Sequence, residues 1–392
     1  MKIYNLLCFG FIPWGTMWKR NQSMVWEMAK LNFIGDVVFI NPDVSLWQSI
    51  RHNILYKQLK TPKTTQTICS NIRKYTPIYL LPERIQVKTI QKYESRKHAQ
   101  KIIRLNRNNP YILIMNCPNL QYTDVLDVLL ENADLSIFDL SDDFVELVTK
   151  NKVRKRYQHN ISKYVSSADL VFIINNHLKY KYGHLNKNCH IVRNGTNYLN
   201  FQRDNYRSIP LLDSLKSTKK PIIGYSGISN LGRIDTELLF YLLKEKPEWN
   251  FVFVGSQGEK LLAKFPGQHN LYHIPAVPYD ELPDHIYYFD VAIVPFKINE
   301  HTRGNNLLKF HDYLAMGKPV VSTNIGGAKH LEKVIRIADS YASFLHDIEA
   351  SLNDMDSTVI QKRKSVAIDN SWPNRIIEVA KIIQNHPKFE TD

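Results

Sequence analysis

The sequence has few of the residues that build metal centres or disulfide frameworks. Its four cysteines, Cys8, Cys69, Cys117 and Cys189, lie far apart and form no Cys-x-x-Cys pair. This spacing argues against a zinc site and against a disulfide-stapled fold, and it fits a reducing compartment. The chain also lacks a Gly-x-x-x-x-Gly-Lys-Ser/Thr loop, which disfavours ATP hydrolysis.

Long hydrophobic runs are missing as well. No apolar stretch approaches the length of about 18 residues that a membrane-spanning helix needs. The apolar start, MKIYNLLCFGFIPWGTMWKR, is interrupted by Pro13 and Gly15 and has no small-residue cleavage site, so it predicts a first β-strand and not a signal peptide. We therefore expect a cytoplasmic protein.

Negative charge is scarce in one region. The chain has a net charge of +14, and residues 51–110 hold 14 Lys and Arg against only Glu83 and Glu94. A positive region of this kind attracts lipid headgroups, nucleic acid or a phosphorylated substrate, although a solvated helix face would look the same. No aromatic RNA-binding motif, helix-turn-helix or zinc signature accompanies the charge, so a nucleic-acid-binding protein is only an alternative.

Short β-branched runs alternate with helical patterns along the whole chain, which predicts parallel α/β domains. Strands are expected near residues 2–9, 36–41, 77–81, 111–115, 135–139, 169–174, 189–193, 221–226, 250–255, 270–274, 290–295, 318–322 and 334–337. The clearest helical patterns cover residues 17–31, 84–106, 143–167, 233–245, 305–316 and 341–353.

A chain of 392 residues is too long for one core, so two Rossmann-like domains are expected. The polar, turn-rich stretch 204–220 reads as the linker. The expected parts are therefore residues 1–203, the linker 204–220, residues 221–370 and a C-terminal helical segment, 371–392. Ligands of open α/β sheets sit at the carboxyl ends of the strands, so the loops there are candidate sites.

Several loops of the second domain suit an anion. One strand runs into Gly224 and Gly227 and then into a helix that starts near Arg233. A second strand ends in Gly255-Ser256, and a third ends at Phe296, before a polar loop that includes Asn305 and Asn306. Glycines allow close approach of a ligand, and helix N-termini favour negative charge. Tight packing alone would also explain each glycine.

The next helix carries Lys309 and Asp312 three residues apart, on one side. Lys309 is expected in the first turn, where its charge adds to that of the free amide groups. A cation beside a carboxylate suits a nucleoside diphosphate, with phosphate on the lysine and ribose hydroxyls on the aspartate. A solvated helix face is the alternative.

An acidic cluster, IFDLSDDFVE, ends a strand of the first domain. Asp142 in this cluster could accept a proton from a hydroxyl group. It could equally be the N-cap of a helix that starts at Asp143.

The motifs of the second half resemble those of GT-B glycosyltransferases of the family-4 type, especially the bacterial group that includes the teichuronic acid glycosyltransferases. The matching segments are YDELP (279–283), FDVAIVPF (289–296) and NLLKFHDYLAMGKPVV (306–321), with ADLVFIINNHL (168–178) and VRNGTNYLNF (192–201) at the end of the first domain. Asp312 stands where glutamate is common in the family, and Gly304 stands where many relatives carry an acid.

The resemblance implies the GT-B fold, with two Rossmann-like domains facing each other across a cleft and a C-terminal helix returning to the first domain. It implies that Lys309 contacts the donor diphosphate and Asp312 the ribose, with Gly227 and Arg233 near the phosphates. The backbone from Ile274 to Val277 would hold the base. The donor-binding set is completed by residues of the loops described above, Ser256, Phe296, Asn305 and Asn306.

For the first domain, the resemblance implies an acceptor site. A Trp-x-Arg-x-Gln segment of the family matches Trp18, Arg20 and Gln22. The glucuronosyltransferase of xanthan assembly has a Ser-Asp at the strand end that corresponds to Ser141-Asp142, and its aspartate is the general base.

The expected protein is a glycosyltransferase for a cell-surface polysaccharide such as teichuronic acid or a capsule. It would use a nucleotide sugar, with UDP as the expected carrier, and a saccharide or polyprenyl-diphosphate-linked acceptor, without metal or other cofactor. Residues 51–110 would dock on the anionic inner face of the plasma membrane. A UDP-sugar 2-epimerase of the same fold is the alternative enzyme. The sequence leaves the sugar, the stereochemistry and the oligomeric state open.

Overall fold

The central strands of this chain are runs of mostly apolar residues that are buried on both faces, as parallel sheets require. The computed structural model describes residues 2–15, 19–45, 64–80, 88–116, 123–303, 307–354 and 356–390. It divides into two compact units, each with its own core. Unit 1 comprises residues 1–192 and 376–392, and unit 2 comprises residues 193–375.

The main sheet of unit 1 has the strand order β10-β9-β8-β7-β1-β2-β5-β4, and all neighbours are parallel except β4 and β5. Its strands are β1 (Tyr4–Phe9), β2 (Ile34–Ile40), β4 (Thr65–Thr67), β5 (Ile72–Tyr75), β7 (Tyr111–Met115), β8 (Leu135–Leu140), β9 (Leu170–Ile173) and β10 (Cys189–Ile191). A separate pair is formed by β3 (Val44–Ser45) and β6 (Ile78–Tyr79).

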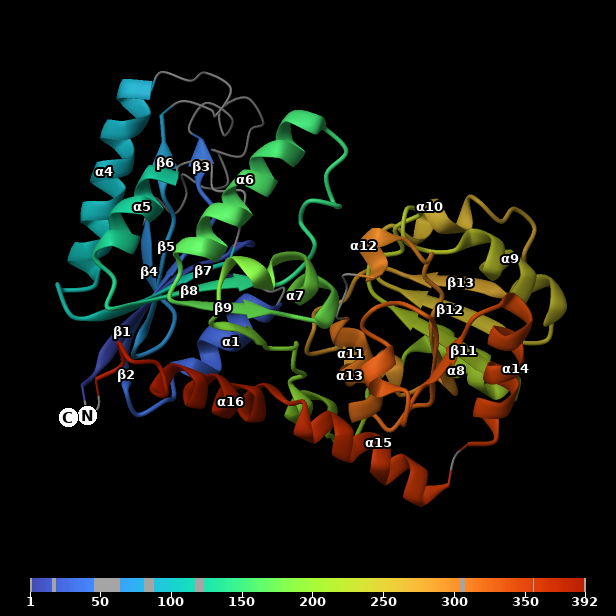
Figure 1. Ribbon diagram of the computed structural model, residues 1–392. Helices are drawn as coiled ribbons and strands as arrows, with labels where there is room; N and C mark the ends of the chain where they lie inside the picture. The colour runs from blue at the N-terminus through green and yellow to red at the C-terminus, as the bar shows by residue number, and fades with distance from the viewer. Residues whose placement is uncertain are drawn as a thin grey trace. The chain divides into compact units, whose positions relative to one another are not determined.

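Helices cover both faces of this sheet. They are α1 (Arg20–Met28), α4 (Lys88–Leu105), α5 (Thr123–Glu131), α6 (Asn151–Ser167), α7 (Asn176–Tyr182) and the end of α16 (Trp372–Gln384), with the short turn η1 (Gly183–Leu185). In Figure 1, α4, α5 and α6 lie on one side of the sheet, and α1 and α16 lie on the other. Near the C-terminus the ring of Phe389 packs on those of Tyr4 and Phe33. This contact holds the segment after α16 against the first strand of the sheet.

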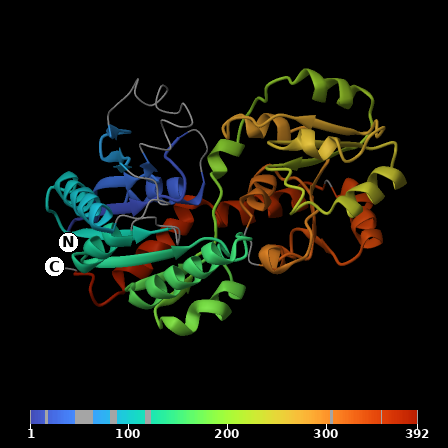
Figure 2. The ribbon, with the colours of Figure 1, turned by 90° about the horizontal axis from the view of Figure 1, so that it is seen from above.

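Unit 2 contains a fully parallel sheet with the order β13-β12-β11-β14-β15-β16. Figure 2 shows the ribbon of this unit from a second direction. Its strands are β11 (Ile222–Ser226), β12 (Asn250–Val254), β13 (Leu271–Ile274), β14 (Val291–Val294), β15 (Val320–Thr323) and β16 (Arg336–Ala338). Every residue of β11, β12, β14 and β15 is buried, which is the pattern of strands covered on both faces.

The helices of unit 2 are α8 (Pro210–Ser217), α9 (Thr236–Glu245), α10 (Gly258–Leu262), α11 (Leu282–Ile286), α12 (Glu300–Arg303), α13 (Leu308–Ala315), α14 (Tyr341–Leu352) and α15 (Ser357–Asp369), with η2 (Tyr198–Phe201) and η3 (Lys329–Leu331). Helix α9 packs on α14, and α13 packs on α15. Tyr313 ties α13 to the sheet, because its hydroxyl oxygen accepts a hydrogen bond from the backbone N–H of Ser226 at 2.7 Å.

Two expectations about the elements are wrong. The helix expected over 143–167 begins only at Asn151, and a turn precedes it, because Phe144 and Val145 face the core. The stretch expected as a linker contains α8, whose Leu212 and Leu215 are buried in the core of unit 2. Their three-residue spacing puts both leucines on one helix face. No helix of the described residues has both the length and the apolar character to cross a bilayer.

Candidate functional site

In unit 2 the candidate donor residues come together at one edge of the parallel sheet. Gly227 follows β11, Ser256 follows β12, Val277 follows β13 and Phe296 follows β14, and these four strands are consecutive neighbours. Parallel neighbours end on the same side, so the loops expected to bind a ligand form a single surface. Asn305 and Asn306 lie outside the described residues.

Lys309 is the second residue of α13 and is half-buried above this edge. Its Nζ lies 3.8 Å from the ring centre of Tyr225 and 5.0 Å from that of Phe296. Among the described residues it forms no ion pair or hydrogen bond. Burial, and then the charge of Arg233, hold the pKa of Lys309 well below its usual range. An ammonium group short of water and of anionic partners is a natural receptor for phosphate.

Gly227 makes room for that ammonium group. Its φ is +130°, a conformation that side chains rarely adopt, and a Cβ there would lie 2.9 Å from Nζ of Lys309. Gly255 has φ of +142°, and its Cβ would lie 2.0 Å from the carbonyl oxygen of Gly227. Gly224 is explained by tight packing alone, because a Cβ at this position would clash with the ring of Phe289. The two later glycines instead allow a close approach of loop, lysine and ligand.

Arg233 supplies a second positive charge close to Lys309, since it contributes to the lowered pKa of that lysine. Its backbone is held between two neighbours: its N–H donates to the carbonyl of Asn230 at 2.9 Å, and its carbonyl accepts from the N–H of Lys297 at 2.8 Å. Its half-buried guanidinium group makes no ion pair with the residues that the structure describes. Arg233, Lys309 and the backbone of Gly227 thus form one positive surface.

Asp312 is buried one turn further along α13. Its Oδ1 accepts hydrogen bonds from Thr196 Oγ1 at 2.8 Å and from the hydroxyl of Tyr279 at 2.9 Å. Burial raises the pKa of Asp312 to about 7, although both hydrogen bonds and Lys309 act in the opposite direction. The carboxylate therefore does not point into bulk water, and two of its bonds go to the protein. A ribose contact remains a prediction.

Three of these partners were missed from the sequence. Tyr225 provides the ring beneath Lys309, while Thr196 and Tyr279 hold Asp312. Thr196 lies in the segment VRNGTNYLNF and Tyr279 begins YDELP, so both belong to segments that carried the resemblance. Only the structure shows that these two segments meet at Asp312.

The candidate acceptor residues of unit 1 have protein partners. The guanidinium group of Arg20 binds both oxygens of Asp139, with Nη2 to Oδ1 at 2.6 Å and Nε to Oδ2 at 2.9 Å, and both side chains are buried. Gln22 is also buried; it accepts from the N–H of Lys19 and donates to the carbonyl of Pro13. Trp18 lies outside the described residues. Arg20 and Gln22 therefore order the start of α1.

Asp142, the candidate base, follows the end of β8 and is half-buried. Its Oδ1 accepts the backbone N–H of Asp143 at 2.9 Å. The alternative as a helix N-cap is wrong, since residues 144–147 form a turn and α6 begins only at Asn151. The neighbouring Asp143 is buried and pairs with Lys181 at 2.8 Å, so it is held within unit 1.

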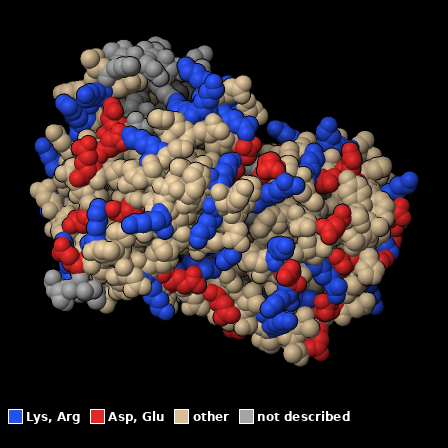
Figure 3. Space-filling view, viewed as in Figure 1, with Lys and Arg blue, Asp and Glu red and all other residues tan. Residues whose placement is uncertain are grey.

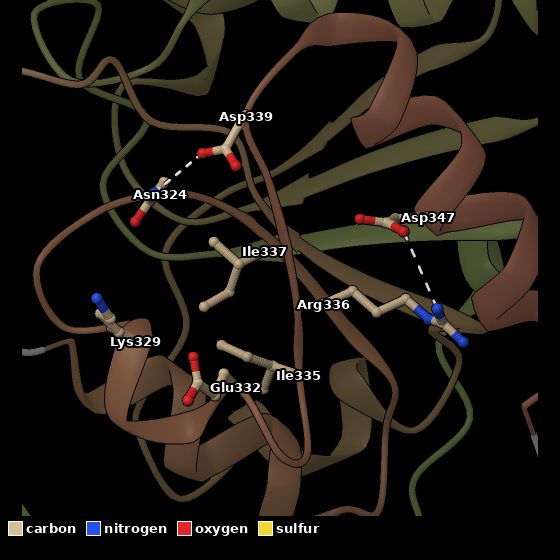
Figure 4. A pocket seen from close by; sticks show the side chains of 8 residues that line it. All are labelled: Asn324, Lys329, Glu332, Ile335, Arg336, Ile337, Asp339 and Asp347. Carbon is tan, nitrogen blue, oxygen red and sulfur yellow. Dashed lines mark hydrogen bonds and ion pairs between the residues drawn. The ribbon is translucent and has the colours of Figure 1, made fainter.

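A polar pocket of about 460 Å³ lies elsewhere in unit 2, beside β16. Figure 4 shows that Asn324 and Asp339 point toward each other across its rim, with a hydrogen bond of 2.9 Å, and that Arg336 reaches toward Asp347. The charged side chains that line this pocket are of both signs. None of the predicted site residues lines it.

Residues 237–354, which include Lys309 and Asp312, match the family described as glycosyl transferases group 1. This part of unit 2 is therefore similar to group 1 glycosyl transferases. Over 212 residues it is 27% identical to the putative teichuronic acid biosynthesis glycosyltransferase TuaH of Bacillus subtilis, and the match covers 50% of this chain and 51% of TuaH. The chain thus spans about half the length of that curated relative in the match.

Solved structures match residues 237–354 together with the rest of the chain. Sucrose-phosphate synthase of Thermosynechococcus elongatus has a TM-score of 0.70 at 12% identity, covering 97% of this chain and 98% of its own. HepE of Anabaena in complex with UDP has a TM-score of 0.63 at 13% identity, covering 97% and 99%. A glycosyltransferase of Rickettsia africae has a TM-score of 0.65 at 14% identity, and the match covers 100% of both chains. The expected GT-B fold is therefore confirmed.

Proposed function

We propose that this chain is a glycosyltransferase that takes a sugar from a nucleotide diphosphate, with UDP as the carrier, and adds it to a lipid-linked saccharide during cell-surface polysaccharide synthesis. The observation that carries the proposal is the position of Lys309, above Tyr225 and next to Gly227 and Arg233. The UDP bound to HepE supports the choice of nucleotide, and the similarity to TuaH supports the class of pathway.

The positive surface of unit 2 suits the leaving group of such a reaction. When the bond between sugar and diphosphate breaks, negative charge grows on the β-phosphate. Fixed cations and backbone amides stabilise that charge without reorganisation, and no other cofactor is needed for this step. Lys309, whose ammonium form is disfavoured by burial, would regain its charge when a diphosphate binds.

Replacing Lys309 tests the donor site. We expect Lys309→Ala to weaken UDP binding by at least about tenfold, because a charge-assisted hydrogen bond contributes about 1.5–3 kcal/mol. Isothermal calorimetry with UDP measures the change. Lys362→Ala on the exposed face of α15 is the matched control and should bind as the parent does. Equal UDP affinity of the parent and Lys309→Ala would remove Lys309 from the site.

Asp142 is the proposed base that accepts the proton of the acceptor hydroxyl. Its place after the carboxyl end of β8 supports this role. We expect Asp142→Asn to lower turnover by about 10²–10⁴ while UDP affinity stays the same, because the change spares unit 2. Transfer from a labelled UDP-sugar panel to a lipid-linked acceptor gives the rate. A loss of less than about tenfold would contradict general base catalysis by Asp142.

The same assay distinguishes a glycosyltransferase from the alternative enzyme, a UDP-sugar 2-epimerase. A glycosyltransferase joins the label to the acceptor, whereas an epimerase returns an isomerised nucleotide sugar. NMR of the product then gives the linkage and the configuration at the transferred carbon.

The proposal includes docking on an anionic membrane through α4 and its surroundings. Figure 3 shows Lys and Arg side chains over this part of unit 1, with Asp and Glu side chains beside them. Exposed apolar side chains stand among these cations: Ile78, Leu80, Ile90 and Tyr93. Cations attract anionic headgroups, and apolar side chains among them can enter the interface. The other cations of the basic region, at residues 51–63 and at Arg84, lie outside the described residues.

A further inference from the structure

A second basic cluster lies in unit 2, on the side of α13 away from Lys309. His311 comes two residues after Lys309, and positions two apart on a helix point in nearly opposite directions. His311 is completely buried, and neither of its ring nitrogens has a hydrogen-bond partner. A buried polar group without a partner costs about 1–3 kcal/mol, so an orphaned imidazole needs an explanation.

A second imidazole lies beside it. The ring of His330, in η3, is centred 6.0 Å from that of His311. Unlike His311, His330 has solvent-exposed surface, although it is shielded enough for burial to lower its pKa, so the pair extends from the interior of unit 2 to its surface. A small solute that reaches His330 is therefore close to the unsatisfied nitrogens of His311.

Arg193 and Arg375 complete the cluster. They come from two segments that are far apart in the sequence and are joined by backbone hydrogen bonds. The backbone N–H of Thr196 donates to the carbonyl of Asn370, and that of Trp372 donates to the carbonyl of Thr196, both at 3.0 Å. This pairing brings the segment of Arg193 to the start of α16, which carries Arg375 in its first turn. Arg375 is buried and donates from Nη2 to Oδ1 of Asn370 at 2.7 Å.

Both arginines act on both imidazoles. Burial is the main cause that lowers the pKa of His311 to about 3 and that of His330 to about 4, and Arg193 and Arg375 lower both values further. The imidazoles are therefore neutral at pH 7. The ring N–H of His311 has no partner, whereas the ring of His330 is hydrogen-bonded to the backbone of Gly327. The amide groups at the start of α16 add positive potential.

We propose that His311, His330, Arg193 and Arg375 form an anion-binding site of unit 2 that is distinct from the surface at Lys309 and receives one carboxylate or phosphate group. Guanidinium groups and the unpaired imidazole N–H of His311 match the oxygens of either anion, and His330 lines the approach to them. The same guanidinium groups repel a metal cation, and no described group of three or more His, Cys, Asp or Glu could hold one.

The identity of the anion that binds here is inferred from the proposed function. For a glycosyltransferase, a carboxylate would belong to an acidic sugar, and a phosphate would belong to a phosphorylated acceptor or to free phosphate. Inorganic phosphate and glucuronate are therefore suitable probes, and glucose is the neutral control.

The test uses the full chain with isotope-labelled histidine, followed by NMR of the imidazole signals at constant ionic strength. We expect saturable shifts of the His311 and His330 signals with phosphate, glucuronate or both, and none with glucose. His311→Phe, which keeps a buried ring, and His330→Ala should each weaken the response at least about tenfold. The exposed His346, changed to Ala, is the control and should leave the response unchanged.

The test of the anion site can fail or succeed independently of the test of UDP binding at Lys309. Lys309→Ala should keep the full response of both imidazoles to the probe anions even though it loses UDP affinity. Absence of saturation with both anions would overturn the proposal. So would a response that disappears in Lys309→Ala, because the anion would then be bound at the donor surface.

Discussion

Asp312 shows how one residue can couple a binding surface to the stability of its domain. Its carboxyl group is buried and receives two hydrogen bonds, yet its folded-state pKa is raised to about 7 because burial disfavours the charged form. The folded protein therefore binds a proton at Asp312 between about pH 4 and pH 7 that the unfolded chain has released. Stability is lost as the pH rises through this range toward the raised pKa.

This sign gives a prediction for Asp312→Asn. The free energy of unfolding of the parent, relative to the variant, should fall as the pH rises from about 4 to about 7, by up to about 4 kcal/mol. Asparagine keeps an acceptor for Thr196 and Tyr279 but does not titrate. Urea unfolding of both proteins at a series of pH values measures the difference. A difference that stays constant, or grows with pH, would contradict the raised pKa.

The sequence predicted the position of Lys309 well and its surroundings less well. Lys309 lies in the first turn of its helix, as its place after a polar loop indicated. The ring of Tyr225 beneath it and the bond from Thr196 to Asp312 depend on contacts between segments far apart in the chain. Spacing along one helix carries no information about such partners. Only the residues that α13 itself contributes to the site could therefore be predicted.

At the scale of elements, α8 belongs to unit 2 and is more than a connection. Leu212 is completely buried in the core, whereas its neighbour Leu211 is exposed. Leu212→Ala should lower the free energy of unfolding by about 2–5 kcal/mol, because it leaves a cavity. Leu211→Ala is the matched control and should change it by less than about 0.5 kcal/mol. Urea unfolding measures both, and similar effects of the two variants would mean that α8 does not pack on the core.

The elements that the sequence predicted are those with strong apolar runs. Strand β7 (Tyr111–Met115) has the expected bounds, and every strand of unit 2 overlaps an expected one. The sequence analysis missed strand β5, which pairs with β2 and has the sequence IRKY. Its two central cations interrupt the apolar pattern by which a strand is recognised. The helix expected from residue 143 failed because DFVELV has an apolar pattern that fits a buried turn as well as a helix.

At the scale of the whole molecule, excess positive charge is concentrated around α4. The apolar side chains of this helix are divided between core and surface: Ile102 is buried, while Ile90 and Tyr93 are exposed. Leu105, near the end of the same helix, is half-buried. Exposed rings and aliphatic side chains beside cations favour a lipid surface over a face that is only solvated.

Sedimentation with vesicles that contain anionic lipid tests this surface. Binding should weaken as salt increases, because each cation near the membrane contributes about 1 kcal/mol. The double change Arg96→Glu and Lys97→Glu should weaken it at least about tenfold, since about 2 kcal/mol is lost. Lys260→Glu with Lys264→Glu makes the same change of charge on exposed residues of unit 2 and is the control. Absence of binding at every salt concentration would rule out docking.

The contact between Gly227 and Gly255 limits how this protein can acquire a new donor. Neither position accepts even a methyl group, since one added carbon would meet Lys309 and the other would meet the carbonyl of its partner glycine. Attempts to alter donor choice by mutagenesis should therefore leave this glycine pair intact and vary the neighbouring rim at Ser256 and Val277. Neither residue has a positive φ, so the backbone there accepts other side chains, which would border the nucleotide sugar if the proposed donor site is correct.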